Sequence, residues 1–228
     1  MWRTYFNKST EINHPLIYNY KTNLPVIDSL LRENKKLIDK KPLENTAIVY
    51  VHHALQTSIN VVHSLVILGA KPSSIFILGK SYSENKEVVS HLKALGVHYI
   101  DSSNQIGFGE YKISFRADIN NLWVTVEENI EERIKDILII DHGGHAIQSI
   151  PSNIKNNYKL IGIEKTTAGT MGYDKRNKPI IPIINVAGCA AKRILESPLI
   201  ADAVSAKVAS HIKTISHDKV CAVIGYGA

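Results

Sequence analysis

The sequence predicts an α/β protein in which helices cover both faces of a mainly parallel β-sheet, giving three αβα layers. Short runs of β-branched and apolar residues alternate with amphipathic stretches along most of the 228 residues, which is the pattern of a sheet built from βαβ units. The runs are nearly continuous in apolar residues, as strands covered on both faces require. A chain of this length can bury a full core.

Each element follows from its local pattern. A helix is expected over Pro25–Asp39, and Gly69 and Gly96 stand where helices should end, because glycine adopts the left-handed conformation found there. Ser83 is the expected N-cap of the helix that begins at Glu84. The expected strands are Thr46–His52, Ser74–Leu78, Val97–Ile100, Ile137–Asp141, Leu160–Glu164, Ile180–Val186 and Lys219–Ile224, and the remaining helices are Ser58–Gly69, Glu84–Leu95, Ile119–Lys135 and Ala190–Ile212.

Composition excludes several classes of protein. No apolar run reaches the roughly 18–20 residues that span a bilayer, and the N-terminus lacks the apolar core of a signal peptide. Cys189 and Cys221 are the only cysteines and form no CxxC motif, which fits reduced thiols. The formal charge of +6 is spread along the chain, without the basic stripe and aromatics of a nucleic-acid surface. We therefore expect a cytoplasmic protein that binds neither membranes nor nucleic acids.

Histidines follow two of the expected strands. His53 comes after the first strand, and Asp141-His142-Gly-Gly-His145 ends the fourth. Ligands of open α/β sheets bind beyond the carboxyl ends of the strands, so these side chains are candidates for a site. A packed or capping histidine fits the pattern about as well. Asp and two His also suggest a metal, but their spacing matches no standard zinc motif, and no metal is expected.

Polar segments also follow the fifth and sixth strands. The fifth ends in Glu164-Lys165-Thr166-Thr167, whose hydroxyls can bind sugar or phosphate oxygens or merely form a turn. The sixth ends at Asn185, and Lys192 lies about one turn into the helix that follows. That lysine is either directed at a ligand or simply an exposed helix residue.

The last ten residues, KVCAVIGYGA, read as a buried strand followed by Gly225-x-Gly227. A dinucleotide-binding βαβ unit begins in this way. Taken alone, the motif equally fits a buried strand and a glycine turn.

Taken in order, these segments resemble the adenosylhomocysteinase (S-adenosyl-L-homocysteine hydrolase) family. The series runs from the first strand-end histidine through DxGG, GxExTTxG and INV followed by a lysine, to the final VxGYG. It extends from about Thr46 to Ala228. The stretches at 65–70 and 123–130 also look like helices of that family.

The resemblance implies a Rossmann-like or flavodoxin-like substrate domain over residues 1–213, and a hinge with the first strand of an NAD-binding domain over 214–228. It implies an NAD-dependent hydrolase of one-carbon metabolism. The implied enzyme acts on a nucleoside or a related small molecule by reversible oxidation of the 3′-hydroxyl, and it forms a homo-oligomer. The fragment should not turn over or retain NAD. The implied catalytic residues are His53, Lys192, Glu196 and His142, the substrate-binding residues Asp141, Glu164, Lys165 and Asn185, and the cofactor-binding residues Thr166, Thr167, Gly225 and Gly227.

Several positions depart from the family pattern. His142 replaces a catalytic aspartate and Lys165 replaces a ribose-binding glutamate, which inverts the local charge. Leu55, Ala168, Ala187 and Ser197 replace a Thr, a Thr, an Asn and an Asn. An altered, anionic substrate is therefore one expectation. A non-catalytic module for small-molecule binding or oligomerisation is the alternative, and a metal-dependent hydrolase at His142 and His145 is a more distant one.

Overall fold

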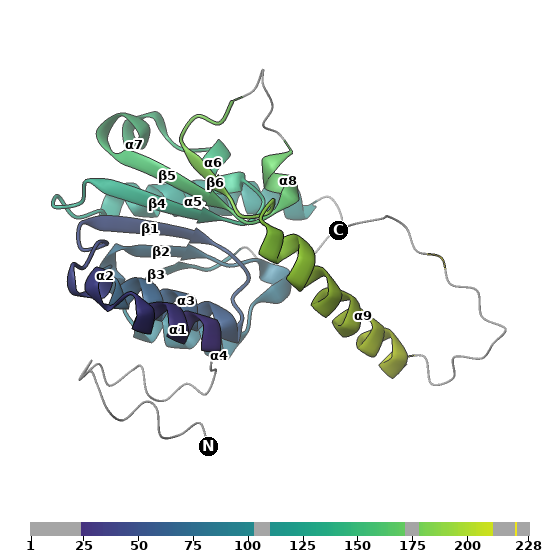
Figure 1. Cartoon of the computed structure of the whole chain (residues 1–228). Helices are drawn as coiled ribbons and strands as arrows, with labels where there is room; N and C mark the ends of the chain where they lie inside the picture. Colours follow the sequence, from purple (N-terminus) through teal and green to yellow (C-terminus); the bar gives the residue numbers. More distant parts are fainter. Residues whose placement is uncertain (1–23, 103–109, 172–177, 212–221, 223–228) are drawn as a thin grey trace. The chain divides into compact units, whose positions relative to one another are not determined.

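The computed structural model describes residues 24–102, 110–171, 178–211 and 222. It confirms the predicted fold class, because six strands form one all-parallel sheet with helices between them (Figure 1). The strand order is β3-β2-β1-β4-β5-β6. The strands are β1 (Thr46–Val51), β2 (Ile75–Leu78), β3 (His98–Ile100), β4 (Asp136–Asp141), β5 (Lys159–Glu164) and β6 (Ile183–Asn185).

Helices alternate with these strands as the sequence predicts. The longer ones are α1 (Pro25–Glu33), α3 (Gln56–Ile67), α4 (Lys86–Ala94), α5 (Glu110–Asn129) and α9 (Ser197–His211). The shorter ones are α2 (Lys35–Asp39), α6 (His145–Gln148), α7 (Ser152–Asn157) and α8 (Thr167–Thr170), with 3-10 turns η1 (Pro72–Ser74) and η2 (Ser81–Ser83) and a π-helical turn η3 (Ala191–Glu196). No helix in the described ranges is both long enough and apolar enough to cross a bilayer.

The chain divides into two compact units. The first comprises Met1–Ala47 and His52–Ile134, and the second comprises Ile48–Val51 and Lys135–Ala228. This division falls inside the predicted substrate domain. The predicted boundary between residues 213 and 214 lies outside the described residues and stays a prediction, as do the strand Lys219–Ile224 (apart from Ala222) and both glycines of the final motif.

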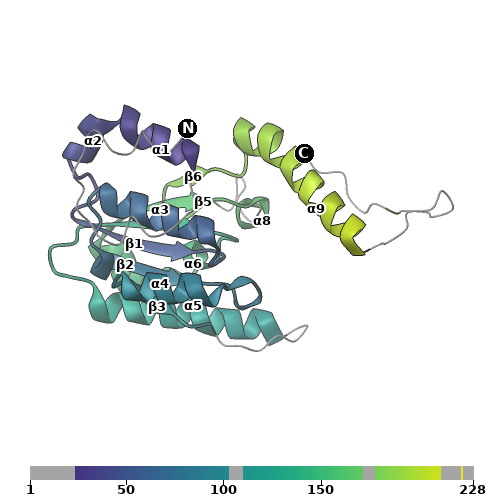
Figure 2. The ribbon, with the colours of Figure 1, turned by 90° about the horizontal axis from the view of Figure 1, so that it is seen from below.

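The first unit contains β2 and β3 with α3, α4 and α5 (Figure 2). β2 pairs with β3 in parallel, with Phe76 opposite His98 and Leu78 opposite Ile100. All four residues of β2 are buried, as a strand covered on both faces should be. Leu122 and Trp123 of α5 are also buried in this unit. The predicted burial is thus confirmed for β2.

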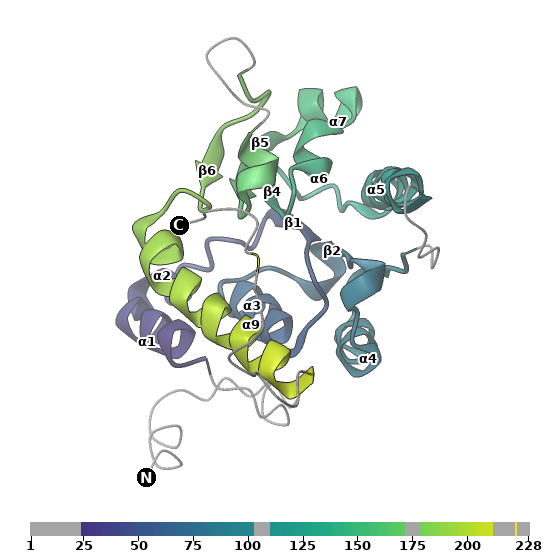
Figure 3. The ribbon, with the colours of Figure 1, turned by 90° about the vertical axis from the view of Figure 1, so that its right-hand side faces the viewer.

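The second unit contains β4, β5 and β6, which pair in parallel and lie side by side (Figure 3). Here the predicted burial is wrong for β5 and β6. Ile161 is 49% exposed and Ile184 is 57% exposed, although both are apolar strand residues. The segment that leaves β5 contains only the four-residue helix α8 in its described part, and no long crossover helix there covers this face.

Helix ends agree with the prediction where glycine fixes them. Gly69 and Gly96 have φ angles of 106° and 89° directly after α3 and α4, a conformation that side chains with a Cβ rarely adopt. The predicted cap at Ser83 is wrong. Asn85 caps α4 instead, because its side chain accepts from the amides of Glu87 and Val88.

Two predicted helices have different forms. The helix expected over Pro25–Asp39 is broken at Asn34, whose side-chain and backbone N–H groups both bond to the carbonyl of Leu30. The stretch expected as a single helix over Ala190–Ile212 begins as the π-helical turn η3 before α9. Pro198 is the second residue of α9, directly after η3, and without an N–H group it cannot donate to the preceding helical turn.

Candidate functional site

The ends of three strands in the second unit place polar side chains in one row. Asp141 ends β4, Glu164 ends β5 and Asn185 ends β6. The strand register sets Asp141 opposite Glu164, and Glu164 opposite Asn185. The prediction that polar residues gather at the carboxyl edge of the sheet is therefore confirmed for these three residues.

Asp141 is fully buried and is held by the loop that follows it. Its Oδ1 accepts from the amide of His142 at 2.7 Å, and its Oδ2 accepts from the amide of Ile147 at 3.0 Å. Burial, with a smaller contribution from the negative charge of Glu164, raises the pKa of this carboxyl to about 6, although the backbone hydrogen bonds act to lower it. The side chain thus organises the DHGGH loop from within.

Glu164 is also fully buried and organises the next loop. Its Oε1 accepts from the amide and hydroxyl of Thr166, both at 2.7 Å, and from the amide of Gly143 at 3.2 Å. Its Oε2 has no hydrogen-bond partner within the described ranges. Gly169 lies against the carboxylate so closely that a Cβ there would overlap it. One carboxylate therefore joins the loops after β4 and β5.

The two threonines after β5 have different environments. The hydroxyl of Thr166 donates to Glu164 and accepts from the amide of Gly169 at 3.0 Å, and so caps α8. Thr167 is exposed. Thr166 thus supports the loop, while Thr167 has the accessible hydroxyl.

The positively charged candidates also differ in exposure. Lys165 is half-buried, and its Nζ lies 4.8 Å from the centroid of the Tyr50 ring, within range of a cation–π interaction. His142 is half-buried, and His145 is exposed on α6. Lys165 is therefore directed at an aromatic face.

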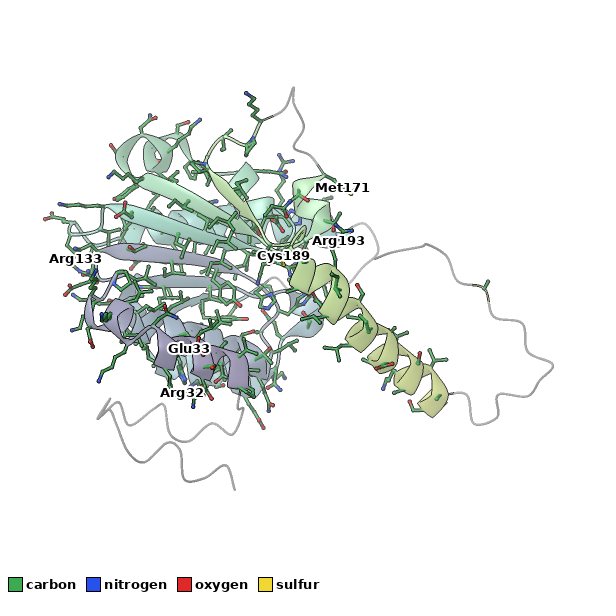
Figure 4. All side chains as sticks on the ribbon, in the orientation of Figure 1. Arg32, Glu33, Arg133, Met171, Cys189 and Arg193 are labelled. Carbon is green, nitrogen blue, oxygen red and sulfur yellow. The ribbon has the colours of Figure 1, made fainter. Side chains whose placement is uncertain are left out.

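After β6 the chain turns sharply toward the predicted catalytic lysine. The side-chain oxygen of Asn185 accepts from the amide of Gly188 at 3.1 Å, and Cys189 Sγ accepts from the amide of Lys192 at 3.4 Å. Figure 4 shows Cys189 and Arg193 where the chain enters the helical segment. The turn places Lys192 at the start of η3.

Lys192 and Glu196 form an ion pair across η3. The Nζ of Lys192 lies 3.1 Å from Oε2 of Glu196, and their side chains are 31% and 43% exposed. The four-residue spacing predicts that both side chains lie on one face of the helix, and the ion pair agrees with that placement. Single π-helical turns often mark functional sites, and this one carries both predicted residues.

In the first unit, His53 lies two residues after the last residue of β1. Its ring Nδ1 forms a short hydrogen bond with Ser83 Oγ, and its ring meets that of Tyr82 edge-on, with centroids 5.6 Å apart. Its carbonyl accepts from the hydroxyl of Ser58 at 2.6 Å. His53 is half-buried and is fixed on both its ring and its backbone.

Ser83 is a site residue that the prediction missed, because the cap pattern assigned it to a helix end. It comes five residues after β2 ends, on η2. The signal that could have found it is its position beyond the end of the strand adjacent to β1, since neighbouring parallel strands end at the same edge.

The described residues include no group of three or more His, Cys, Asp or Glu side chains arranged to hold a metal ion. A hydrolase centred on His142 and His145 therefore has no supporting donor set in that part of the chain.

The fold defines an α/β protein with a parallel sheet. The second unit has buried carboxylates at its strand ends and a lysine–glutamate pair, and the first unit has a half-buried histidine. Comparison with known proteins does not assign the chain to a family. No protein-family model matches the chain. Two uncharacterized proteins of Mycobacterium tuberculosis, from strains CDC 1551 and H37Rv, are each 24% identical to it over 216 residues, or 91% of the chain. The chain spans 40% of the length of these relatives.

Proposed function

We propose that this chain is the substrate-binding part of an NAD-dependent enzyme of the adenosylhomocysteinase type, acting on a nucleoside or a related small molecule by reversible 3′-oxidation. The observation that carries the proposal is the Lys192–Glu196 ion pair, which lies on a π-helical turn shortly after β6. Both residues match functional positions of the family that the sequence resembles. A cytoplasmic homo-oligomer is the expected setting of such an enzyme.

In this proposal Lys192, as the neutral amine, takes up the proton of the ribose 3′-hydroxyl and becomes an ammonium. Glu196 stabilises that ammonium, since the Lys192 Nζ lies 3.1 Å from its Oε2 and 3.4 Å from its Oε1. The chemistry requires a base close to the reacting hydroxyl. His53 moves a proton at C5′, where the leaving group departs. Lys192, Glu196 and His53 are half-buried, as groups that must reach a ligand should be.

NAD, when bound, would supply the acceptor for the hydride that leaves the sugar carbon. Of the residues assigned to it, Thr167 fits best because it is exposed. Thr166 fits less well, since its hydroxyl already donates to Glu164 and accepts from Gly169. Gly225 and Gly227 lie outside the described residues.

The substrate in this proposal is anionic. The family resemblance would place a carboxylate at position 165, and this chain has a lysine with its ammonium over the Tyr50 ring. Asp141 cannot compensate readily, because both of its oxygens accept from its own loop. Glu164 is fully buried, and its Oε1 already accepts from the loops. A site that has exchanged a carboxylate for an ammonium favours a phosphate or carboxylate group on the ligand.

Calorimetric titration tests the substrate class. Adenosine and adenosine 5′-monophosphate are titrated into the chain and into a Lys165→Met variant. We expect the monophosphate to bind the unaltered chain on the order of tenfold more tightly than adenosine, and the variant to lose this preference. Binding of adenosine alone, or an equal preference in both proteins, would contradict the anionic substrate. A Lys155→Met variant, altered on exposed helix α7, is the matched control.

The second candidate is a non-catalytic module for binding or oligomerisation. One observation favours it: both strand-end carboxylates are fully buried and stabilise loops, so they offer a ligand little. The same titration separates the candidates when it includes a Lys192→Met variant. An enzyme site should bind nucleosides and lose affinity with the lysine, whereas binding that is absent, or unaffected by the substitution, would favour the module.

A further inference from the structure

We propose that Ser83 is a positioning residue that keeps the hydrogen of the neutral His53 ring on Nδ1, so that Nε2 is the nitrogen that takes up and releases protons. The inference starts from two hydrogen bonds of one hydroxyl. Ser83 Oγ forms a short bond with Nδ1 of His53 and lies 3.2 Å from the carbonyl oxygen of Lys80, to which it donates.

The direction of the first bond follows from the second. A serine hydroxyl has one hydrogen to donate. The Lys80 carbonyl can only accept, so a hydroxyl that donates to it must accept from its other partner. Nδ1 of His53 is then the donor, and a neutral imidazole with its hydrogen on Nδ1 has its lone pair on Nε2.

The surrounding backbone fixes this chain of bonds. The amide of Ser83 donates to the same Lys80 carbonyl at 2.8 Å, which closes the η2 turn. The amide of Asn85 donates to the carbonyl of Ala54 at 2.9 Å, which ties the segment after η2 to the loop that carries His53. The serine and the imidazole are therefore held at a set separation by main-chain bonds on both sides.

Aromatic packing restricts the ring further. Tyr82 meets the His53 ring edge-on, with centroids 5.6 Å apart and planes at 66°. His52 meets it from another direction at 5.5 Å and 69°. A 180° flip of the ring would put Cδ2 in the place of Nδ1 and so break the bond to Ser83.

This arrangement has a chemical consequence. The bond from Nδ1–H to Ser83 is the same in the neutral ring and in the imidazolium, since Nδ1 carries its hydrogen in both. His53 can therefore gain and lose a proton on Nε2 without rearranging its support. The transfer of protons between Nε2 and a substrate rests on the proposed function. The assignment of the hydrogen to Nδ1 in the neutral ring does not depend on it.

Nitrogen NMR of the isotopically labelled chain tests the tautomer directly. The shifts of the two ring nitrogens, assigned to His53 by comparison with a His53→Gln variant, report which one carries the hydrogen in the neutral ring. We expect Nδ1 in the unaltered chain. Ser83→Ala should change the ratio of the two tautomers about fivefold, as the loss of one ordinary hydrogen bond supports. Ser83→Thr, which keeps the hydroxyl, should restore the original ratio.

Matched controls keep the result clear. Ser64→Ala removes a hydroxyl that bonds to the Asn60 carbonyl in α3 and should leave the His53 nitrogens unchanged. A neutral ring with its hydrogen on Nε2 in the unaltered chain would overturn the proposal, even if Ser83→Ala fails to fold. An unchanged ratio in a folded Ser83→Ala would overturn it too. A chain with the expected tautomer that binds no nucleoside would contradict the proposed function alone.

Discussion

Glu84 lies beyond the end of β2, and Glu164 is the last residue of β5. A Cβ added to Gly79 would overlap the first carboxylate, and a Cβ added to Gly169 would overlap the second. Their partners differ. Oε1 of Glu84, in the first unit, accepts from the hydroxyls of Tyr99 at 2.9 Å and Ser102 at 3.1 Å. Glu164, in the second unit, accepts mainly from backbone amides.

The two carboxylates also differ in their exposure to solvent. Glu84 is half-buried, whereas Glu164 is fully buried beside the equally buried Asp141. The first unit thus satisfies its carboxylate with side-chain hydroxyls, and the second uses two buried carboxylates as acceptors for the backbone of its loops. A carboxylate at a strand end is therefore not by itself a ligand-binding group, since its hydrogen-bond partners decide its role.

The largest expected effect comes from filling the space beside the fixed carboxylate. Gly169→Ala would push a methyl group into Glu164, which three hydrogen bonds hold in place. We expect the free energy of unfolding to fall by about 3 kcal/mol, as for overpacking of a rigid core. Denaturant unfolding measures the change.

Alanine substitutions at two other glycines serve as comparisons for Gly169→Ala. Gly188→Ala should be close to neutral, because a Cβ there makes only ordinary contacts with Asn185. A Cβ at Gly79 would overlap the ends of two side chains, Glu84 and Tyr99. Gly79→Ala should still cost less than Gly169→Ala, because both of these side chains are half-buried and their ends can shift, whereas Glu164 is fully buried. Equal losses at positions 79 and 169 would remove the distinction between the two units.

The second prediction concerns pH. The pKa of Asp141 is raised in the folded chain from an ordinary 3.8 to about 6. Its contribution to stability is therefore complete below pH ~4 and is lost as pH rises through about 6. We expect the difference in unfolding free energy between the unaltered chain and Asp141→Asn to decline by about 2–3 kcal/mol between pH 4 and pH 7.

Using the difference removes the contributions of groups that titrate equally in both proteins. The constant cost of losing an acceptor for the amide of His142 or Ile147 does not alter the slope. A difference that stays constant over this pH range, or that increases, would show that the carboxylate is not destabilised by its burial.

The third prediction concerns the hydrogen bonds of Glu84 in the first unit. Tyr99→Phe removes one of the two hydroxyls that bond to Glu84. We expect a loss of about 1 kcal/mol in unfolding free energy. Tyr158→Phe is the control, because that hydroxyl makes no hydrogen bond in the described part of the chain. The pKa of Tyr99 is raised by its burial and by Glu84, so its phenolate should be absent from a spectroscopic titration of the folded chain until other tyrosines have ionised.

Sequence patterns predicted the fold and much of the candidate site. Runs of apolar residues identified the strands, because a buried strand requires apolar side chains at its own positions. Glycines identified the ends of α3 and α4, because a positive φ angle favours glycine at that position. The row of Asp141, Glu164 and Asn185 followed from the rule that parallel strands end together. The placement of Lys192 and Glu196 on one helix face followed from their four-residue spacing.

The rest depended on contacts between distant segments. Ser83 lies 30 residues from His53, and nothing in the local sequence around it distinguishes a ring partner from a helix cap. The exposed face at Ile161 and Ile184 could not be foreseen either, because apolar composition does not report which helices cover a strand. The full burial of Asp141 and Glu164 likewise depends on loops that fold back onto them.

The smallest expected effect on stability is at the Lys192–Glu196 pair. Glu196→Gln removes a charge from a pair whose side chains are 31% and 43% exposed, and partly exposed ion pairs contribute little because water screens them. We expect the free energy of unfolding to change by less than about 0.5 kcal/mol. A loss of more than about 2 kcal/mol would instead assign the pair a structural role like that of Glu164.

A small effect makes this variant informative about function. Since folding would be almost unaffected, a clear drop in nucleoside affinity of Glu196→Gln, measured by the same calorimetry, could not be attributed to a disturbed fold. Asp202→Asn, on the exposed helix α9, supplies the matched loss of one negative charge and should keep full affinity. If both variants bind equally well, the pair is a surface ion pair, and the half-exposed residues of the second unit are then no more functional than its buried carboxylates.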